Sequence, residues 1–132
     1  MQIEEPLLSA IILVARLSLA LVFLVSGIHK GLNFAESAVE FRDARVPAIG
    51  FFLPFTIALH LLASLAIIAG VFVLEGALAL ALFTAVATIK VHCFWRMTGR
   101  ERLERSRVAM ANLAVIGGLL LLAASGPGRL VL

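Results

Sequence analysis

The chain is poor in cysteine, in charge and in the motifs that hold cofactors. Its 132 residues include one cysteine, Cys93, no tyrosine and only 14% charged residues. A single cysteine excludes an internal disulfide, and without CxxC or Cys/His spacing we expect no metal site. Haem pairs, iron–sulfur cysteines and flavin or nicotinamide fingerprints are also absent, so no intrinsic cofactor is expected. No catalytic residue can therefore be assigned from a motif.

Apolar residues are what the sequence has in excess. They make up 62% of the chain, and the mean hydropathy is +1.10. A soluble chain of this length cannot bury so much apolar surface, whereas a lipid bilayer can cover it if helices satisfy the backbone. We expect one transmembrane domain over residues 1–132, with the lipid bilayer as its main partner. The basic residues behind the net charge of +3 lie mostly in two loops between apolar runs and not on a basic, aromatic-rich face, which argues against nucleic acid.

Four apolar runs of transmembrane length predict an all-α fold, an integral membrane antiparallel four-helix bundle. The expected transmembrane helices cover about residues 7–28, 49–74, 76–95 and 108–124, each near the roughly 20 residues that cross a bilayer. We expect the first run to be a span and no signal peptide, because Glu4 and Glu5 precede it. Residues 31–48 and 96–107 are predicted to be loops, the first with a short interfacial helix ending before Val46-Pro47.

The distribution of basic residues predicts the orientation in the membrane. Of the 11 Lys and Arg residues, nine lie in or beside the two long loops, while Arg129 follows the last span and Arg16 lies within the first. Such asymmetry is typical of cytoplasmic loops in membrane proteins. We therefore expect a multi-pass protein of the bacterial inner membrane with both loops cytoplasmic and both termini extracytoplasmic.

Ionisable residues within a span cost about 2.5–3.5 kcal/mol each on insertion scales, so they mark the places to look for function. Arg16 in the first span and His60 in the second are both expected near the midplane, given a rise of ~1.5 Å per residue. No Asp or Glu lies inside a predicted span to neutralise Arg16. We expect the two residues to face one cavity and hold a polar ligand, although His60 could equally bridge two helices.

Each predicted span also carries a stripe of polar residues that should turn away from lipid and converge in a cleft. The alternatives are that Ser and Thr only bond to their own helix, that Asn112 bridges two helices, and that Trp95 is an interfacial anchor. The candidate ligand-binding residues are Arg16, Lys30, His60, Thr88, His92, Trp95 and Asn112.

Several short segments follow one another in a characteristic order along nearly the whole chain. They are Arg16, the run from Leu21 to Lys30, Val46-Pro47, Leu82-Phe83-Thr84 with Ala87-Thr88, the run from Val91 to Trp95, Asn112, Gly117-Gly118 and the run from Gly126 to Leu130. In this order and spacing the chain resembles the DoxX family of small four-helix membrane proteins. It differs at His60 and Cys93, where family members commonly have an acidic residue.

The resemblance implies a membrane subunit of a quinone-linked oxidoreductase system, since some DoxX proteins are subunits of thiosulfate:quinone oxidoreductase. Such a subunit would bind a quinone and dock a cytoplasmic or membrane redox partner on segment 96–107, which holds Arg96, Arg100, Arg102, Arg105 and Arg107. The alternative is a non-enzymatic anchor or assembly subunit whose basic loop binds a partner or anionic lipid. A small-solute transporter is disfavoured because no inverted repeat is visible. The sequence carries no signal for an oligomeric state.

Overall fold

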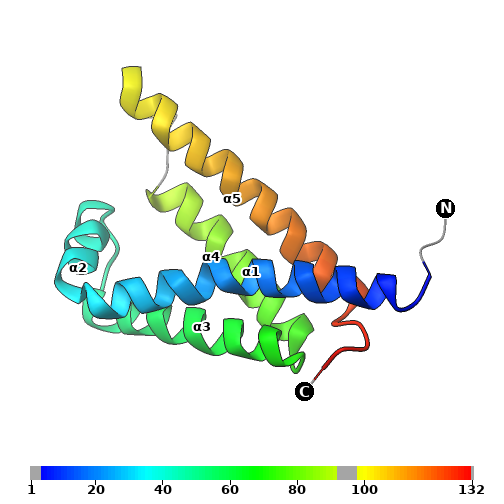
Figure 1. The fold of residues 1–132 in the computed structure, drawn as a ribbon. Coiled ribbons are helices and arrows are strands. Elements are labelled where there is room, and N and C mark those ends of the chain that lie inside the picture. Colours follow the sequence, from blue (N-terminus) through cyan, green and yellow to red (C-terminus); the bar gives the residue numbers. More distant parts are fainter. Residues whose placement is uncertain (1–3, 92–97, 132) are drawn as a thin grey trace.

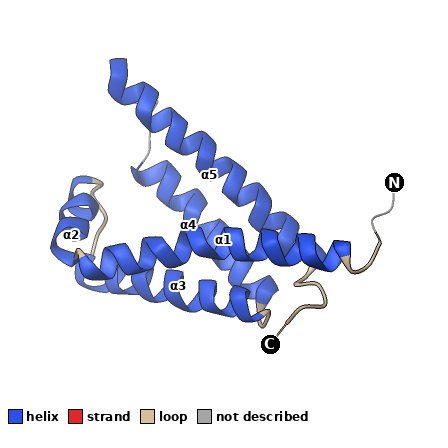
Figure 2. Ribbon diagram, viewed as in Figure 1, coloured by secondary structure: helices blue, strands red, loops and turns tan. Residues whose placement is uncertain are grey.

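The computed structural model describes residues 4–91 and 98–131, which form five helices and their connecting turns (Figures 1 and 2). Four helices are long and apolar enough to cross a membrane: α1 (Leu7–Leu32), α3 (Ile49–Ala69), α4 (Val73–Val91) and α5 (Gly99–Ser125). The short helix α2 (Phe34–Asp43) follows α1 directly. The predicted all-helical, four-span architecture is confirmed.

Helix α2 is the short amphipathic helix expected within residues 31–48. Phe41 is buried, whereas Glu36 and Glu40 on the same helix are exposed. After α2 the chain turns, with the Val46 N–H donating to the Phe41 carbonyl at 3.0 Å, before α3 begins. Because α1 runs to Leu32, four residues beyond its predicted end at 28, the connection between α1 and α2 is a single residue.

The turn between α3 and α4 lies earlier than predicted. The expected span 49–74 is wrong at its end, because α3 stops at Ala69 and Gly70 follows with φ +83°. The N–H groups of Gly70 and Val71 both donate to the Ala66 carbonyl, at 2.9 and 3.0 Å. Glycine adopts this left-handed conformation without a Cβ penalty, so it ends helices readily. Hydropathy did not indicate this helix end, because apolar residues lie on both sides of Gly70.

The predicted loop 96–107 is also corrected, because its described part from residue 99 onward is the first two turns of α5. Arg and Glu are good helix formers, and Arg100 pairs with Glu104 one turn later at 3.5 Å. The expected span 108–124 is therefore only the apolar part of a 27-residue helix. In Figure 1 these charged turns project beyond the neighbouring end of α4.

The helices form two antiparallel pairs, α1 with α3 and α4 with α5, and α3 packs on α4 to join the pairs (Figure 1). A Cβ added to Gly27 of α1 would meet the His60 and Leu61 side chains of α3 at 3.0–3.1 Å. A Cβ on Gly118 of α5 would meet Leu19 of α1 at 3.1 Å. Small residues of this kind allow close approach of helices within a membrane.

The core lies where the pairs meet, and the outer surface is apolar. Ala20, Ile67, Ala77, Leu80 and Leu119 have no exposed surface. No more than 33% of the most apolar stretch of any span is buried inside the chain. The rest is largely exposed Leu, Val, Ile and Phe. Lipid is the solvent that such a surface requires.

Candidate functional site

The hydroxyl groups of the predicted polar stripes are satisfied within their own helices. Each donates to a backbone carbonyl three or four residues earlier, which is the packing interpretation of Ser and Thr in membrane helices. The bonds are Thr56 to Phe52 (2.7 Å), Ser64 to Leu61 (3.0 Å), Thr84 to Leu80 (2.7 Å) and Thr88 to Thr84 (2.7 Å). These hydroxyls line the inner faces of the helices without offering a free donor.

Arg16 of α1 is 2% exposed and is held by backbone carbonyls. Its Nη1 donates to the Pro127 carbonyl at 2.7 Å, and its Nη2 donates to the Ile68 carbonyl at 3.0 Å. Ile68 lies in the last turn of α3, where carbonyls lack a helical partner and a cation is favoured by the helix dipole. The Arg16 Nε has no partner among the described residues. Arg16 thus links three segments of the chain through dipoles instead of a carboxylate.

The prediction that Arg16 and His60 share one depth is wrong. Because α1 and α3 are antiparallel, Arg16 lies beside Ile68, while Phe23 lies beside His60 with ring centroids 5.3 Å apart. Eight residues separate His60 from Ile68, which is ~12 Å at the α-helical rise. Both side chains are buried, but Arg16 lies toward the end that holds the chain termini.

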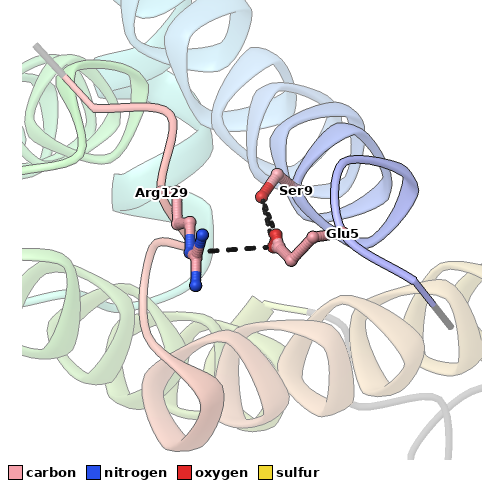
Figure 3. Close-up of polar contacts among 3 residues, drawn as sticks. All are labelled: Glu5, Ser9 and Arg129. Carbon is pink, nitrogen blue, oxygen red and sulfur yellow. Dashed lines mark hydrogen bonds and ion pairs between the residues drawn. The ribbon is translucent and has the colours of Figure 1, made fainter. Parts of the chain in front are cut away.

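A second polar cluster, formed by Glu5, Ser9 and Arg129, lies at that end of the bundle (Figure 3). Sequence analysis did not identify it. The Ser9 hydroxyl donates to the Glu5 carboxylate at 2.7 Å, and the same carboxylate lies 3.9 Å from Arg129. Arg129 is exposed, so the ion pair contributes little free energy by itself. It nevertheless shows that the segment after α5 folds back against the start of α1. Opposite charges just outside the first and last spans were the available signal.

His60 occupies an apolar, aromatic position at the junction of α1, α3 and α4. It is 4% exposed, and its ring meets Phe23 of α1 and Phe83 of α4 edge-on, with centroids 5.3 and 4.8 Å away. Neither ring nitrogen has a hydrogen-bond partner among the described residues. The alternative that His60 bridges two helices by a hydrogen bond is therefore not what the structure shows. A buried donor without a partner costs about 1–3 kcal/mol.

Lys30, two residues before the end of α1, is half-buried and its Nζ donates to the Ser26 hydroxyl at 2.7 Å. Ser26 adjoins Gly27, whose position lies against the His60 Cβ. The ammonium of Lys30 is therefore at the level of His60 along the bundle. Lys30 and His60 are thus one pair of candidate residues that the structure places at the same level.

The remaining candidates lie elsewhere or outside the described residues. Asn112 of α5 donates through Nδ2 to the Thr88 hydroxyl of α4 at 2.9 Å, which joins the second helix pair. His92 and Trp95 fall within residues 92–97, which are not described, as does Cys93. Among the described residues no three His, Cys, Asp or Glu side chains are grouped to hold a metal ion. The polar residues thus form separate clusters, not one convergent stripe.

Sequence analysis did not single out the walls of the His60 position. Phe83 appeared there only within the short motif Leu82-Phe83-Thr84, and Gly27 only within the run from Leu21 to Lys30. Phe23 did fall on one face with Arg16 and Lys30 at heptad spacing. The contact between the Phe23 and His60 rings could not be predicted, because the sequence does not show which residues of α3 lie opposite Phe23.

Four apolar helices with polar side chains buried between them define a multi-pass helical protein of the inner membrane. The sequence model of the DoxX family matches residues 11–93, so the chain belongs to the DoxX family. It is similar to Inner membrane protein YqjF of Escherichia coli (strain K12), with 34% identity over 117 residues, 89% of this chain and 85% of that protein. It is also similar to Inner membrane protein YphA of the same strain, with 25% identity over 92% of this chain and 87% of that protein. No solved structure matches the chain significantly.

Proposed function

We propose that the chain is the membrane subunit of a quinone-linked oxidoreductase system and binds the head group of a quinone, or a similar lipophilic ligand, at His60. The observation that carries this proposal is a 4% exposed imidazole whose two nitrogens lack partners among residues 4–91 and 98–131. A neutral imidazole has one donor and one acceptor, and a quinone carbonyl oxygen can accept a hydrogen bond from that donor. Binding would remove the cost of the unpaired donor.

The surroundings of His60 suit a flat, apolar ring. Phe23 and Phe83 already contact the imidazole edge-on, and aromatic rings pack well in offset or edge-on arrangements. Ser64 and Thr56, one turn away on either side, are buried but bonded to their own helix. They do not compete for the ring nitrogens, so His60 remains the polar contact that an entering head group would meet on α3.

Equilibrium binding of radiolabelled decylubiquinone to the full chain in lipid nanodiscs tests the proposal. We expect His60→Leu to lower the affinity about tenfold or more, which corresponds to one hydrogen bond of ~1.4 kcal/mol. Ser64→Ala is the matched control, since Ser64 is equally buried on the same helix but self-bonded, and should bind as the original chain does. Quinone that binds the His60→Leu chain with unchanged affinity would refute the proposal.

The charged turns of α5 favour a second candidate, a non-enzymatic anchor or assembly subunit. The side chains of Arg100 and Glu104 are 91% and 65% exposed, and this part of α5 projects past α4 (Figure 1). Exposed charge on a rigid projection suits docking of a cytoplasmic partner or anionic lipid headgroups. In a native pull-down, Arg100→Gln with Arg102→Gln should weaken such a complex most at low salt while insertion is retained. If this variant fails to accumulate and its complex affinity is unchanged, the segment is structural.

A further inference from the structure

The side chain of Lys30 points away from the nearer end of its helix. A lysine close to the end of a transmembrane helix normally extends its flexible stem to the adjacent interface. Lys30 is two residues from the end of α1, yet its ammonium bonds to Ser26, one turn deeper in the span. Lys90, one residue from the end of α4, is by contrast exposed. Lys30 is thus an inward-directed cation.

Within residues 4–91 and 98–131 this cation has no ionic partner of its own. Among the described residues no carboxylate forms an ion pair with Lys30. Glu36 and Glu40 of the neighbouring helix α2 are both exposed. An ammonium offers three donors, and the Ser26 hydroxyl accepts one of them. In a medium of low dielectric such a charge attracts an anion strongly.

The uncompensated charge and the unpaired imidazole lie at one level. Ser26 and Gly27 are neighbours on α1; the first holds the Lys30 ammonium and the second packs against His60. Phe23, Gly27 and Lys30 share one face of α1, because they are four and three residues apart. A head group that reaches the His60 ring at this level of the bundle would therefore also come near the Lys30 ammonium.

We propose that Lys30 makes the His60 site selective for lipophilic ligands whose head group carries an ionised oxygen, such as an alkylated hydroxyquinone, over their neutral analogues. This inference rests on the proposed function, which requires only that a quinone-like ring bind at His60. The enolate oxygen accepts a charge-assisted hydrogen bond from the Lys30 ammonium, and a ring carbonyl accepts from His60. The apolar tail lies among the helices or in lipid.

A matched pair of ligands tests the proposed function and the selectivity for an ionised head group separately. The probes are 2-hydroxy-3-alkyl-1,4-naphthoquinone, ionised at neutral pH, and its 2-methoxy analogue, which cannot ionise. Both are titrated into the full chain in nanodiscs of uncharged lipid, and each affinity is compared between variants so that lipid partition cancels. We expect Lys30→Met to weaken the ionised ligand about tenfold or more and leave the methoxy analogue within about twofold, the size of one charge-assisted hydrogen bond.

Three further variants keep the result interpretable. Lys30→Gln should behave as Lys30→Met, and Lys30→Arg should keep the preference, which guards against a single variant that misfolds. Lys90→Met removes an exposed charge from a similar position on α4 and should leave both affinities unchanged. If Lys30→Met and Lys30→Gln alter both ligands equally, or if Lys90→Met removes the preference, the selectivity does not come from Lys30 and this inference is wrong. If neither ligand binds the original chain, the proposed function fails and the inference fails with it.

Discussion

Replacing Arg16 with leucine tests whether this residue holds the bundle together through backbone carbonyls. Its guanidinium donates to Ile68 at the end of α3 and to Pro127 in the segment after α5. That segment also packs through Gly128 on Ile12 of α1. Leucine fills the apolar space but leaves both carbonyls without their donor. We expect the bundle to insert normally and to lose stability at the end that holds the termini.

The magnitude follows from the two bonds. Hydrogen bonds between membrane helices contribute about 0.6 kcal/mol on average and ~1.7 kcal/mol at most. Two of them predict a loss of about 1–3 kcal/mol in the free energy of unfolding for Arg16→Leu. Arg16→Lys keeps the charge but reaches fewer carbonyls, so it should fall about halfway. The bond to Pro127 alone predicts a rise of about 3-fold to 20-fold in the open population of the C-terminal segment.

Two measurements check these values on the full chain. Unfolding in mixed detergent and SDS, followed by circular dichroism, gives the change in free energy. Digestion with carboxypeptidase reports how often residues 126–131 detach. Ser18→Ala on the same helix is the control, because the Ser18 hydroxyl is exposed and bonds only to the Val14 carbonyl. If Arg16→Leu unfolds and is digested like the control, the carbonyl contacts do not hold the C-terminal segment.

Three further predictions concern packing and orientation. Gly27→Ala should separate α1 from α3 and destabilise the bundle, because the new Cβ would meet His60 at 3.1 Å. A Cβ at Gly117 has nothing within 4 Å, so Gly117→Ala should stabilise α5 by up to ~1 kcal/mol through helix propensity; SDS unfolding of both variants measures the two changes. Asn112→Leu and Thr88→Val should each cost about 0.6–1.7 kcal/mol, and the double variant should cost no more than either single one, since both remove the bond between α4 and α5. Because the distribution of Lys and Arg predicts extracytoplasmic termini, a reporter enzyme that works only in the periplasm should be active when fused after Leu132. Activity of a reporter that works only in the cytoplasm would contradict that orientation.

The aromatic position of His60 also bears on how this chain differs from the usual DoxX pattern. From the resemblance we expect an acidic residue at this position in other family members, and a buried carboxylate would need a donor or a cation nearby. The imidazole is instead surrounded by Phe23 and Phe83 and tolerates an apolar site at smaller cost. Lys30 lies at the same level and could serve either residue type. The comparison of His60→Glu with the original chain in the hydroxyquinone titration would show which charge the site accepts.

The number of spans and the burial of their polar faces could be predicted from the sequence by itself. Membrane insertion depends on the summed hydropathy of about 20 consecutive residues, which is a local property of the chain. Polar faces turn inward because lipid offers no hydrogen bonds, and Thr56, His60 and Thr84 are buried in the bundle, as the predicted polar stripes require. Helix ends were predicted less well, since Gly70 ends α3 within an apolar run and α5 continues into a charged segment.

Only the tertiary structure decided which residues meet. The register between α1 and α3 depends on side-chain packing around Gly27, and this places Arg16 opposite Ile68 and Phe23 opposite His60. The partners of Arg16 are backbone carbonyls, which every residue carries and no sequence pattern distinguishes. The direction of the Lys30 side chain was likewise set by the hydroxyl one turn away. The position of a residue within its span can be read from the sequence alone. A site requires residues far apart in the sequence to lie at one level of the bundle, and this depends on how the helices pack.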